Sequence, residues 1–410
     1  MLCCENGCCG CSETTSNESN TTSSEAVTAT TQSADEKTTR DLFAMDTYIT
    51  LTAYGNNAEA GISAAEACIQ DLDARLSTGN SESEIAKLNA TGSGTLSEDT
   101  SAILQEAITL YQDTDGAFNP LMYPIMQAWG FPTHEYRVPE DSEIQSLLQL
   151  TDPSKMQFSA ETGAVSFSVS GMELDLGGIA KGYTSSAMMD CFRSNGVTSG
   201  MVSLGGNVQT IGTKPDGSLW KVAIQNPTAA EDADFLGILE TNDCAVITSG
   251  GYERYFEENG VRYHHIMDPA TGKPAESDLT SVTIVSENGT LADGLSTALF
   301  VMGLDKAIAY WQAHASEFDA VLCTEDETLY VTEGIQDAFS ANYPCEIIQQ
   351  NNAGKTYTLG IAVRIFTSST FSSVCNHIDA RLYCTDFFGG TGRYGGFYAG
   401  NHCKWEKIQF

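Results

Sequence analysis

The stretch from Glu173 to Tyr183, Glu-Leu-Asp-Leu-Gly-Gly-Ile-Ala-Lys-Gly-Tyr, constrains this chain more than any other. Its apolar start predicts a short strand, and the two glycines after it predict the beginning of an amphipathic helix that runs to about Arg193. A glycine pair lets the backbone approach a ligand, and a helix N-terminus offers free N–H groups. Because Lys181 adds a positive charge in the first turn, the junction predicts a phosphate site. The alternative is an ordinary strand-to-helix turn.

The glycine spacing fits neither the phosphate loop of P-loop enzymes nor the dinucleotide fingerprint G-x-G-x-x-G. The chain carries 54 acidic and 20 basic residues, a net charge of −34. This balance argues against nucleic acid, or an anionic membrane surface, as the main partner. An anionic ligand therefore needs local help from a metal ion, from backbone N–H groups or from one of the few lysines.

The order of the expected elements favours an α+β fold with mixed or antiparallel sheets and flanking helices over a doubly wound sheet. After a strand at 47–54, helical periodicity and capping residues predict helices at 58–76, at 81–89 with Ser81 as the cap, after Ser97, and at 140–150. Strands dominate the second half, and most are bounded by turn residues. They are expected at 164–169, 173–176, 201–204, 220–225, 245–249, 263–266, 281–285, 320–323 and 328–332, with helices at 291–302 and 305–316.

Composition divides the chain into three parts. Residues 1–40 contain a Ser/Thr/Asn/Glu tract that cannot pack a core, so they are expected to be a leader and a disordered linker. Residues 41–341 are expected to form the folded domain. In residues 342–410 the charge balance changes to 6 basic and 4 acidic residues, with four of the 13 cysteines. This tail is either an appended small module or the product of a shifted reading frame, and no role is assigned to it.

The N-terminal segment Gly7–Ser12, Gly-Cys-Cys-Gly-Cys-Ser, resembles the end of a bacterial lipoprotein signal with Cys11 as the lipid acceptor. The charged and apolar regions that should precede it are missing, so we expect the recorded start to be truncated. The alternative is a cysteine-rich leader without function. No run of 18 apolar residues exists, so the expected membrane attachment is through the lipid alone.

Asp293 and Thr297 are four residues apart at the start of an expected helix, so their oxygen atoms project from one face. A carboxylate and a hydroxyl suit a hard divalent ion such as Mg²⁺, which retains water and binds substrate phosphates. The alternative is a helix cap in which Thr290 is the N-cap and Asp293 its partner three residues later.

His265 ends an expected strand before a turn that contains Asp268, Pro269 and Gly272. This position suits a general base or a hydrogen bond to a ligand. For an isolated histidine, a structural role is the alternative.

Together with two further Gly-Gly segments, these motifs resemble the FAD:protein FMN transferases of the ApbE family. The resemblance covers about Asp41 to Asp337 and depends on several motifs in the same order. They are Met45-Asp-Thr, Ser83-Glu-Ile-Ala-Lys-Leu-Asn, Gly116-Ala-Phe-Asn-Pro, Asp175-Leu-Gly-Gly-Ile-Ala-Lys-Gly-Tyr, Leu204-Gly-Gly-Asn, Ser249-Gly-Gly-Tyr-Glu-Arg, His265-Ile-Met-Asp-Pro-Ala-Thr-Gly and Asp293-Gly-Leu-Ser-Thr-Ala-Leu.

The resemblance implies an ApbE-like, T-fold-like architecture and a cleft for FAD. It implies that Mg²⁺ is held by the main-chain carbonyl of Gly178 with Asp293 and Thr297, and that His265 acts as base or phosphate contact. The residues that it implies for the FAD site are Met45, Ala117, Phe118, Asn119, Asp175, Lys181, His265 and Met267.

Three positions depart from the family pattern. Asn119 replaces the usual Asp, and Gly178 replaces a common Ala at the carbonyl ligand. Gly79 occupies a position where many of these transferases place a Tyr, so water is expected to compete for FAD.

The implied reaction is Mg²⁺-dependent transfer of FMN from FAD to a Thr or Ser hydroxyl of a target protein, with release of AMP. Redox-complex subunits are the expected targets, and the expected location is the outer side of the bacterial cytoplasmic membrane. Two alternatives stay open: an Mg²⁺-dependent FAD pyrophosphatase that gives FMN and AMP, and a non-catalytic FAD-binding lipoprotein.

Overall fold

The computed structural model describes residues 36–228, 234–350, 394–398 and 403–407 of the 410-residue chain. The chain divides into two units, Met1–Ala362 and Val363–Phe410. In the second unit, the described part is one antiparallel pair, β20 (Tyr394–Tyr398) with β21 (Cys403–Lys407). All other elements belong to the first unit.

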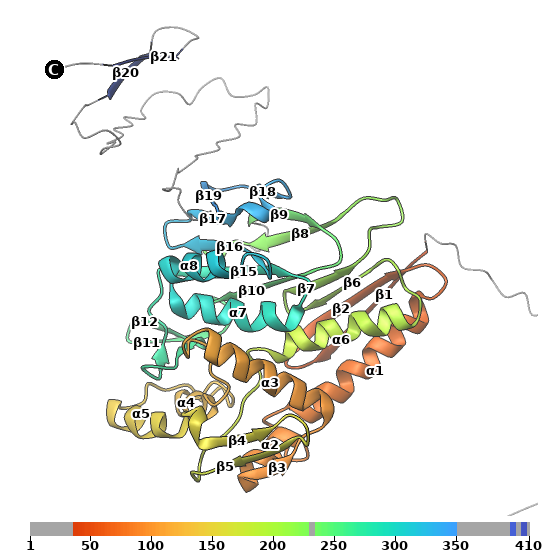
Figure 1. Cartoon of the computed structure of the whole chain (residues 1–410), viewed down its shortest axis with the longest axis vertical. Coiled ribbons are helices and arrows are strands. Elements are labelled where there is room, and N and C mark those ends of the chain that lie inside the picture. The colour runs from red at the N-terminus through yellow and green to blue at the C-terminus, as the bar shows by residue number, and fades with distance from the viewer. Residues whose placement is uncertain (1–35, 229–233, 351–393, 399–402, 408–410) are drawn as a thin grey trace, which may run out of the picture. The chain divides into compact units, whose positions relative to one another are not determined.

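A nine-stranded sheet forms the centre of the first unit (Figure 1). Its neighbouring strands are antiparallel, except that β17 and β19 run parallel. In spatial order the strands are β1 (Lys37–Ala44), β2 (Thr47–Tyr54), β6 (Gly200–Leu204), β7 (Asn207–Ile211), β10 (Ala245–Gly250), β15 (Leu279–Ser286), β16 (Asp319–Thr324), β17 (Leu329–Thr332) and β19 (Cys345–Ile348). The expected α+β fold with mixed and antiparallel sheets is confirmed.

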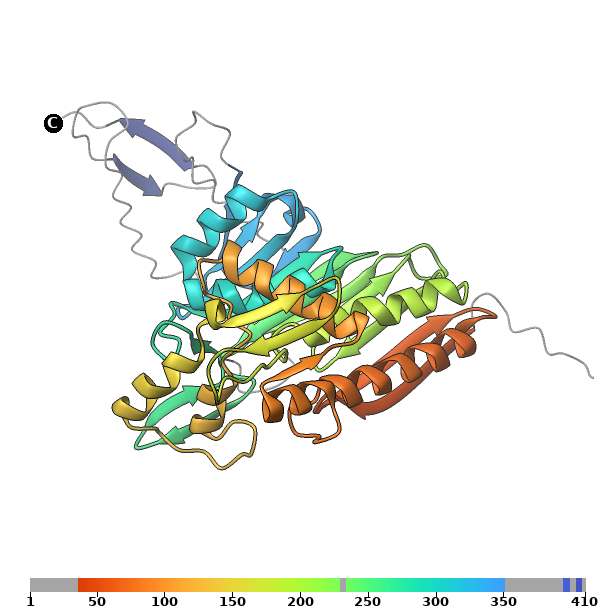
Figure 2. The same cartoon turned by 60° about the horizontal axis from the view of Figure 1, so that its bottom comes forward.

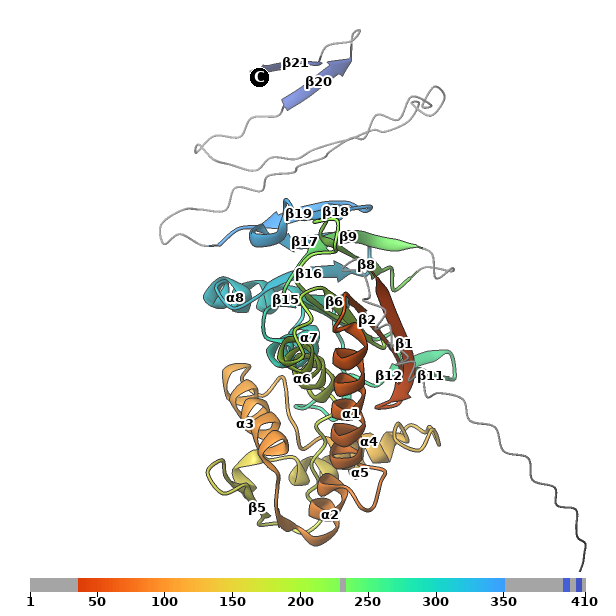
Figure 3. The same cartoon turned by 90° about the vertical axis from the view of Figure 1, so that its right-hand side faces the viewer.

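Helices cover one face of this sheet, and α1, α6 and α7 lie side by side on it (Figure 3). Helix α1 buries apolar residues that recur at helical spacing, among them Ile62, Ile69 and Leu72. Ile62 and Ile69 pack with Met188 and Phe192 of α6 in a core over β2 and β6. The helices of this layer are α1 (Ala58–Leu76), α6 (Ala180–Ser194), α7 (Gly289–Met302) and α8 (Leu304–His314), and α3 (Glu98–Asp113) packs against α7.

A three-stranded sheet covers the other face. Val222, Leu239 and Phe339 from this small sheet share a core with Val246 and Val321 of the central sheet. Its strands are β8 (Trp220–Gln225), β9 (Phe235–Thr241) and β18 (Phe339–Ala341).

The remaining elements surround one end of the helical layer (Figure 2). They are α2 (Glu84–Thr91), β3 (Ser93–Thr95), α4 (Tyr123–Trp129), α5 (Asp141–Leu147), β4 (Met156–Ser159), β5 (Ala164–Phe167), and the hairpins β11 (Tyr255–Glu258) with β12 (Val261–His264) and β13 (Met267–Asp268) with β14 (Lys273–Pro274). Among the described residues, no helix is long and apolar enough to cross a membrane.

Several boundaries differ from the expectation. Strand β1 starts at Lys37, inside the segment expected to be linker, because its pairing with β2 compensates for its polar composition. Strand β19 extends the domain past residue 341 to Ile348. Helix α2 is capped by Ser83, whose hydroxyl accepts from the amide of Ala86, and not by Ser81. Cys11 and most of the 342–410 tail lie outside the described residues.

The expected strand at 173–176 is wrong. The segment has no strand partner; its backbone is held by Asn89, whose side chain bonds both polar backbone groups of Leu174, and by the amide of Asp175, which donates to the carbonyl of Pro120. Apolar composition alone could not show this, because the signal for a strand and for a buried extended loop is the same at this length.

Candidate active site

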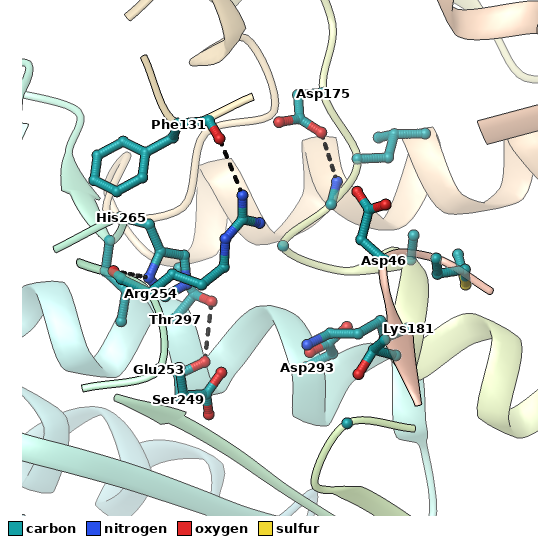
Figure 4. Close-up of a pocket in the computed structure, with 18 of the residues that line it drawn as sticks. Asp46, Phe131, Asp175, Lys181, Ser249, Glu253, Arg254, His265, Asp293 and Thr297 are labelled. Carbon is teal, nitrogen blue, oxygen red and sulfur yellow. Dashed lines mark hydrogen bonds between the residues drawn. The ribbon is translucent and has the colours of Figure 1, made fainter. Parts of the chain in front are cut away.

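A cleft of about 1350 Å³ lies beside the N-terminus of α6. Small-molecule pockets typically have volumes of about 300–1,000 Å³, so this cleft has room for a ligand as large as a dinucleotide. Its walls come from segments far apart in the sequence: the β1–β2 turn, the end of α1, residues 117–133, the start of α6, the end of β10, the 265–269 segment and one face of α7. Figure 4 shows a close-up of residues that line it.

Two hairpin turns form one wall of the cleft. Met45 and Asp46 both have positive φ, 51° and 56°, and connect β1 to β2 in a two-residue turn. The turn between β6 and β7 packs against it, since a Cβ on Gly205 would lie 2.1 Å from the Thr47 hydroxyl oxygen. This close approach fixes the position of Met45 and Asp46 in the cleft wall.

The Gly-Gly junction also lines the cleft. Gly177 donates its backbone N–H to the Asp175 carboxylate at 2.8 Å, and Figure 4 draws this bond. Burial raises the pKa of Asp175, and the Gly177 hydrogen bond opposes the rise. A Cβ on Gly178 would lie 3.1 Å from the Phe118 ring and 4.0 Å from the Thr297 hydroxyl oxygen. Gly178 therefore lies next to Thr297, as the predicted ligand set requires.

Asp293 is 4% exposed and is held from two sides. Its Oδ2 accepts from the backbone N–H of Gly182 at 2.8 Å, and its Oδ1 accepts from the side-chain amide of Asn207 at 3.0 Å. Burial raises the pKa of Asp293, while the charge of Lys181 and these hydrogen bonds oppose the rise. The alternative of a Thr290 cap is wrong, because Asn288 is the N-cap of α7 and bonds the amide of Leu291.

The hydroxyl groups of Ser296 and Thr297 lie one helical turn after Asp293 on α7, and that of Ser249 on β10 lies beside them. The Ser249 hydroxyl is 2.7 Å from that of Ser296 and 3.3 Å from that of Thr297. Among the described residues, no three His, Cys, Asp or Glu side chains gather as metal ligands. A metal here would depend on one carboxylate, a hydroxyl and a main-chain carbonyl. This all-oxygen set fits a hard divalent ion that keeps water and substrate as its other ligands.

Lys181 supplies positive charge to the cleft. Its ammonium group lowers the pKa of both Asp293 and Glu253, in opposition to the larger effect of burial. It also contributes to the low pKa of His265. One lysine thus acts on acidic and basic groups on both sides of the cleft.

His265 is held in one tautomer. Its Nδ1 lies 3.2 Å from the carbonyl oxygen of Arg254, which can only accept, so Nδ1 carries the proton and Nε2 has the free lone pair. The Arg254 guanidinium in turn donates to the carbonyl of Phe131 at 3.2 Å (Figure 4). Burial and the charges of Arg254 and Lys181 lower the pKa of His265 to about 3. The imidazole is therefore neutral near pH 7, and its Nε2 carries no proton.

Every candidate ligand residue named from the sequence lines this cleft, although their roles stay predictions. These residues are Met45, Ala117, Phe118, Asn119, Asp175, Gly178, Lys181, His265, Met267, Asp293 and Thr297. Gly79 lines it too. The side chain of Asn119 is already engaged, because it donates to the carbonyl of Thr151 at 2.8 Å and accepts from the amide of Leu121 at 2.9 Å.

The polar cleft residues to which sequence reasoning assigned no role include Asp46, Ser249, Glu253 and Arg254. Ser249, Glu253 and Arg254 belong to the Ser249-Gly-Gly-Tyr-Glu-Arg motif, so a search for polar groups within each motif could have found them. Asp46 belongs to the Met45-Asp-Thr motif, so the same search could have found it too.

Comparison with known proteins gives consistent results. The family model of the ApbE family matches residues 45–322. The chain is 33% identical over 299 residues to an FAD:protein FMN transferase of Klebsiella pneumoniae, which covers 72% of this chain and 92% of that protein. It is 34% identical over 285 residues to an FAD:protein FMN transferase of Treponema pallidum. This match covers 66% of this chain and 78% of that protein.

Solved structures show the same architecture. The ApbE protein of Thermotoga maritima superposes with a TM-score of 0.69 at 31% identity, over 74% of this chain and 99% of that one. The flavin transferase ApbE of Vibrio cholerae superposes with a TM-score of 0.64 at 26% identity, over 75% of this chain and 97% of that one.

Proposed function

The chain belongs to the ApbE family, and on this premise we propose that it transfers FMN from FAD to a Thr or Ser hydroxyl of an acceptor protein and releases AMP. The observation that carries the proposal is the position of a neutral histidine in the same cleft as a helix N-terminus, a lysine and an all-oxygen ligand set. These groups are what a phosphoryl transfer from a dinucleotide needs.

We assign the Mg²⁺ site to the Gly178 carbonyl, Asp293 and Thr297. The fit is supported by the chemistry of the donors, by the proximity of Gly178 to Thr297, and by a buried carboxylate whose charge is not fully compensated. When bound there, the ion would neutralise charge on the diphosphate and on the attacked phosphoryl group.

Lys181 and the start of α6 would bind the diphosphate. The backbone N–H groups of Ala180 and Gly182 in the first turn of α6 already donate to the Leu176 carbonyl and the Asp293 carboxylate. The helix would therefore act on the diphosphate through the positive end of its dipole. Lys181 is in that same turn and acts on both walls of the cleft. The strongly acidic chain thus gains a local positive field for its anionic substrate.

His265 would take the proton of the acceptor hydroxyl. The hydroxyl oxygen attacks the phosphorus atom of the FMN half of FAD, and the proton moves to Nε2 of His265. The bond from this phosphorus to the bridging oxygen breaks, and AMP leaves with that oxygen. The hydrogen bond from Nδ1 to the Arg254 carbonyl keeps Nε2 available throughout.

FAD hydrolysis to FMN and AMP is the second candidate, and one observation favours it. Gly79 lines the cleft, and a Cβ there would meet only the Ser77 hydroxyl, at 3.9 Å. This part of the wall is therefore open, so water could reach the phosphorus in place of the acceptor. A non-catalytic FAD-binding role is the third candidate.

For the location, we propose attachment through lipid on Cys11 outside the cytoplasmic membrane, with subunits of redox complexes as acceptors. The lipoprotein-like Gly7–Ser12 segment and the polar tract after it support the anchor. Mass spectrometry of the protein isolated from its own host tests it: diacylglycerol on Cys11 is expected, and an unmodified Cys11 would refute the anchor.

Incubation of the folded full-length protein with FAD, Mg²⁺ and a carrier domain bearing a Thr-Gly-Ala-Thr segment separates the three functions. Covalent flavin fluorescence on the carrier supports transfer. Free FMN with AMP, and no labelled carrier, supports hydrolysis. Unchanged FAD would reject both enzymatic functions.

A further inference from the structure

An aromatic pair lies on the surface at the mouth of the cleft. Phe43 and Tyr48 are cross-strand partners in the β1–β2 hairpin, with ring centroids 5.4 Å apart in an edge-to-face arrangement. Their exposed fractions are 63% and 81%. The turn between them supplies Met45, Asp46 and Thr47 to the cleft wall. Two large aromatic rings are thus exposed to solvent on either side of a turn that forms part of the cleft wall.

The other exposed large apolar side chains of the described residues do not line the cleft. Each belongs to a segment that contributes to the wall or pairs with one: the 131–138 loop, the β11–β12 hairpin that follows Arg254, and β9 opposite Ala223 of β8. They are Tyr136, Val138, Tyr255, Val261 and Ile238.

Strand β1 also offers a free backbone edge. It is the terminal strand of the nine-stranded sheet and forms an unbroken eight-residue register with β2 only. The carbonyl oxygen of Tyr48 accepts a hydrogen bond from the backbone N–H of Gly205, on the β6 side of β2. The backbone groups of Tyr48 therefore point away from β1, and Phe43 and Tyr48 form a non-hydrogen-bonded pair of the β1–β2 ladder. By alternation, the N–H and C=O groups of Thr39, Asp41 and Phe43 point outward from the sheet.

We propose that the acceptor protein docks an extended segment on this free edge of β1, with an apolar side chain packed on the Phe43–Tyr48 pair, so that its hydroxyl enters the cleft past the Met45–Asp46 turn. The inference rests on the proposed transfer function, which requires a protein hydroxyl at the cleft mouth. Strand addition to a sheet edge provides affinity through main-chain hydrogen bonds and leaves the hydroxyl-bearing residue free to turn inward. The pair acts in docking and takes no part in the chemistry.

Two variants test the proposal with the carrier domain and the full-length protein. Phe43→Ser/Tyr48→Ser removes the anchor, and Thr39→Pro removes one outward N–H while leaving the ladder with β2 intact. Each is expected to raise the KM for the carrier, by about tenfold for the double variant, since anchor residues contribute over 1 kcal/mol and 1.4 kcal/mol is tenfold. The kcat at saturating carrier should be unchanged.

The controls separate docking from chemistry and from folding. Phe43→Tyr/Tyr48→Phe keeps two exposed rings and should keep the wild-type KM. FAD hydrolysis without carrier should be the same in all variants, which also shows that they are folded.

An unchanged carrier KM in either test variant overturns the docking proposal. So does sedimentation showing that the wild type is a dimer that the double variant disrupts, because the pair then serves a second copy. Failure of the wild type to label the carrier would refute the transfer function itself.

Discussion

The backbone amide of Gly182 in α6 donates a hydrogen bond of 2.8 Å to Oδ2 of Asp293 in α7. This contact exists because the two helices approach closely at glycines: a Cβ on Gly182 would lie 2.1 Å from the carbonyl oxygen of Gly289 and 2.6 Å from Cβ of Asp293. The helix that begins at the Gly177–Gly178 junction thus also positions the carboxylate assigned to the metal.

Gly182→Ala should therefore affect both stability and turnover. The added methyl group forces α6 and α7 apart, and overpacking of this kind costs about 1–3 kcal/mol. The same shift breaks the bond to Asp293 and should lower the rate of FAD turnover. Urea denaturation and a turnover assay measure the two effects. Gly79→Ala is the matched control, since its Cβ would meet only one atom, at 3.9 Å; equal stability of the two variants would contradict the tight helix contact.

Gly79→Tyr should shift the balance from hydrolysis to transfer. The open space at this position admits a side chain, and a ring there would restrict the access of water to the flavin side of the cleft. The ratio of labelled carrier to free FMN, measured at one FAD concentration, should rise relative to that of Gly79→Ala. A ratio that falls or stays constant would show that water enters by another route.

Lys181→Met should weaken FAD binding by about tenfold or more, because a hydrogen bond to a charged group contributes about 1.5–3 kcal/mol. Fluorescence titration gives the Kd. Riboflavin, which has no phosphate, is the control ligand and should bind both proteins equally. If Lys181→Met reduced riboflavin affinity as much as FAD affinity, the lysine would not act on the diphosphate.

His265 should make the folded protein less stable as the pH falls. Its pKa is lowered from 6.5 to about 3, so below pH 6.5 the unfolded chain binds a proton that the folded chain does not. The free energy of unfolding then decreases with falling pH, by at most about 1.4 kcal/mol per pH unit. Urea denaturation at several pH values between 5 and 6.5 gives the free energy of unfolding at each pH. This free energy should change less with pH in His265→Gln than in the wild type. The same pH dependence of the unfolding free energy in both proteins would mean that folding does not lower the pKa of His265.

The sequence predicted most of the helices because their apolar residues recur at helical spacing; the expected bounds of α1, 58–76, are those observed. It missed β1, β7 and β9, whose alternation is weak and whose formation depends on strands distant in the chain. It placed the candidate ligands through ordered motifs. It could not show that the side chain of Asn119 is hydrogen-bonded to the backbone of Thr151 and Leu121, since those bonds depend on tertiary packing.

The dependence of carrier flavinylation on Mg²⁺, compared between the wild type and Asp293→Asn, tests the central claim most directly. Asn keeps an acceptor for the Gly182 amide but removes the charge of a ligand. With chelator present, neither protein should label the carrier. The wild type should respond to added Mg²⁺ and saturate, and Asp293→Asn should need at least about tenfold more Mg²⁺ for half-maximal transfer. Transfer that persists without a divalent ion, or an identical Mg²⁺ requirement in both proteins, would contradict the account.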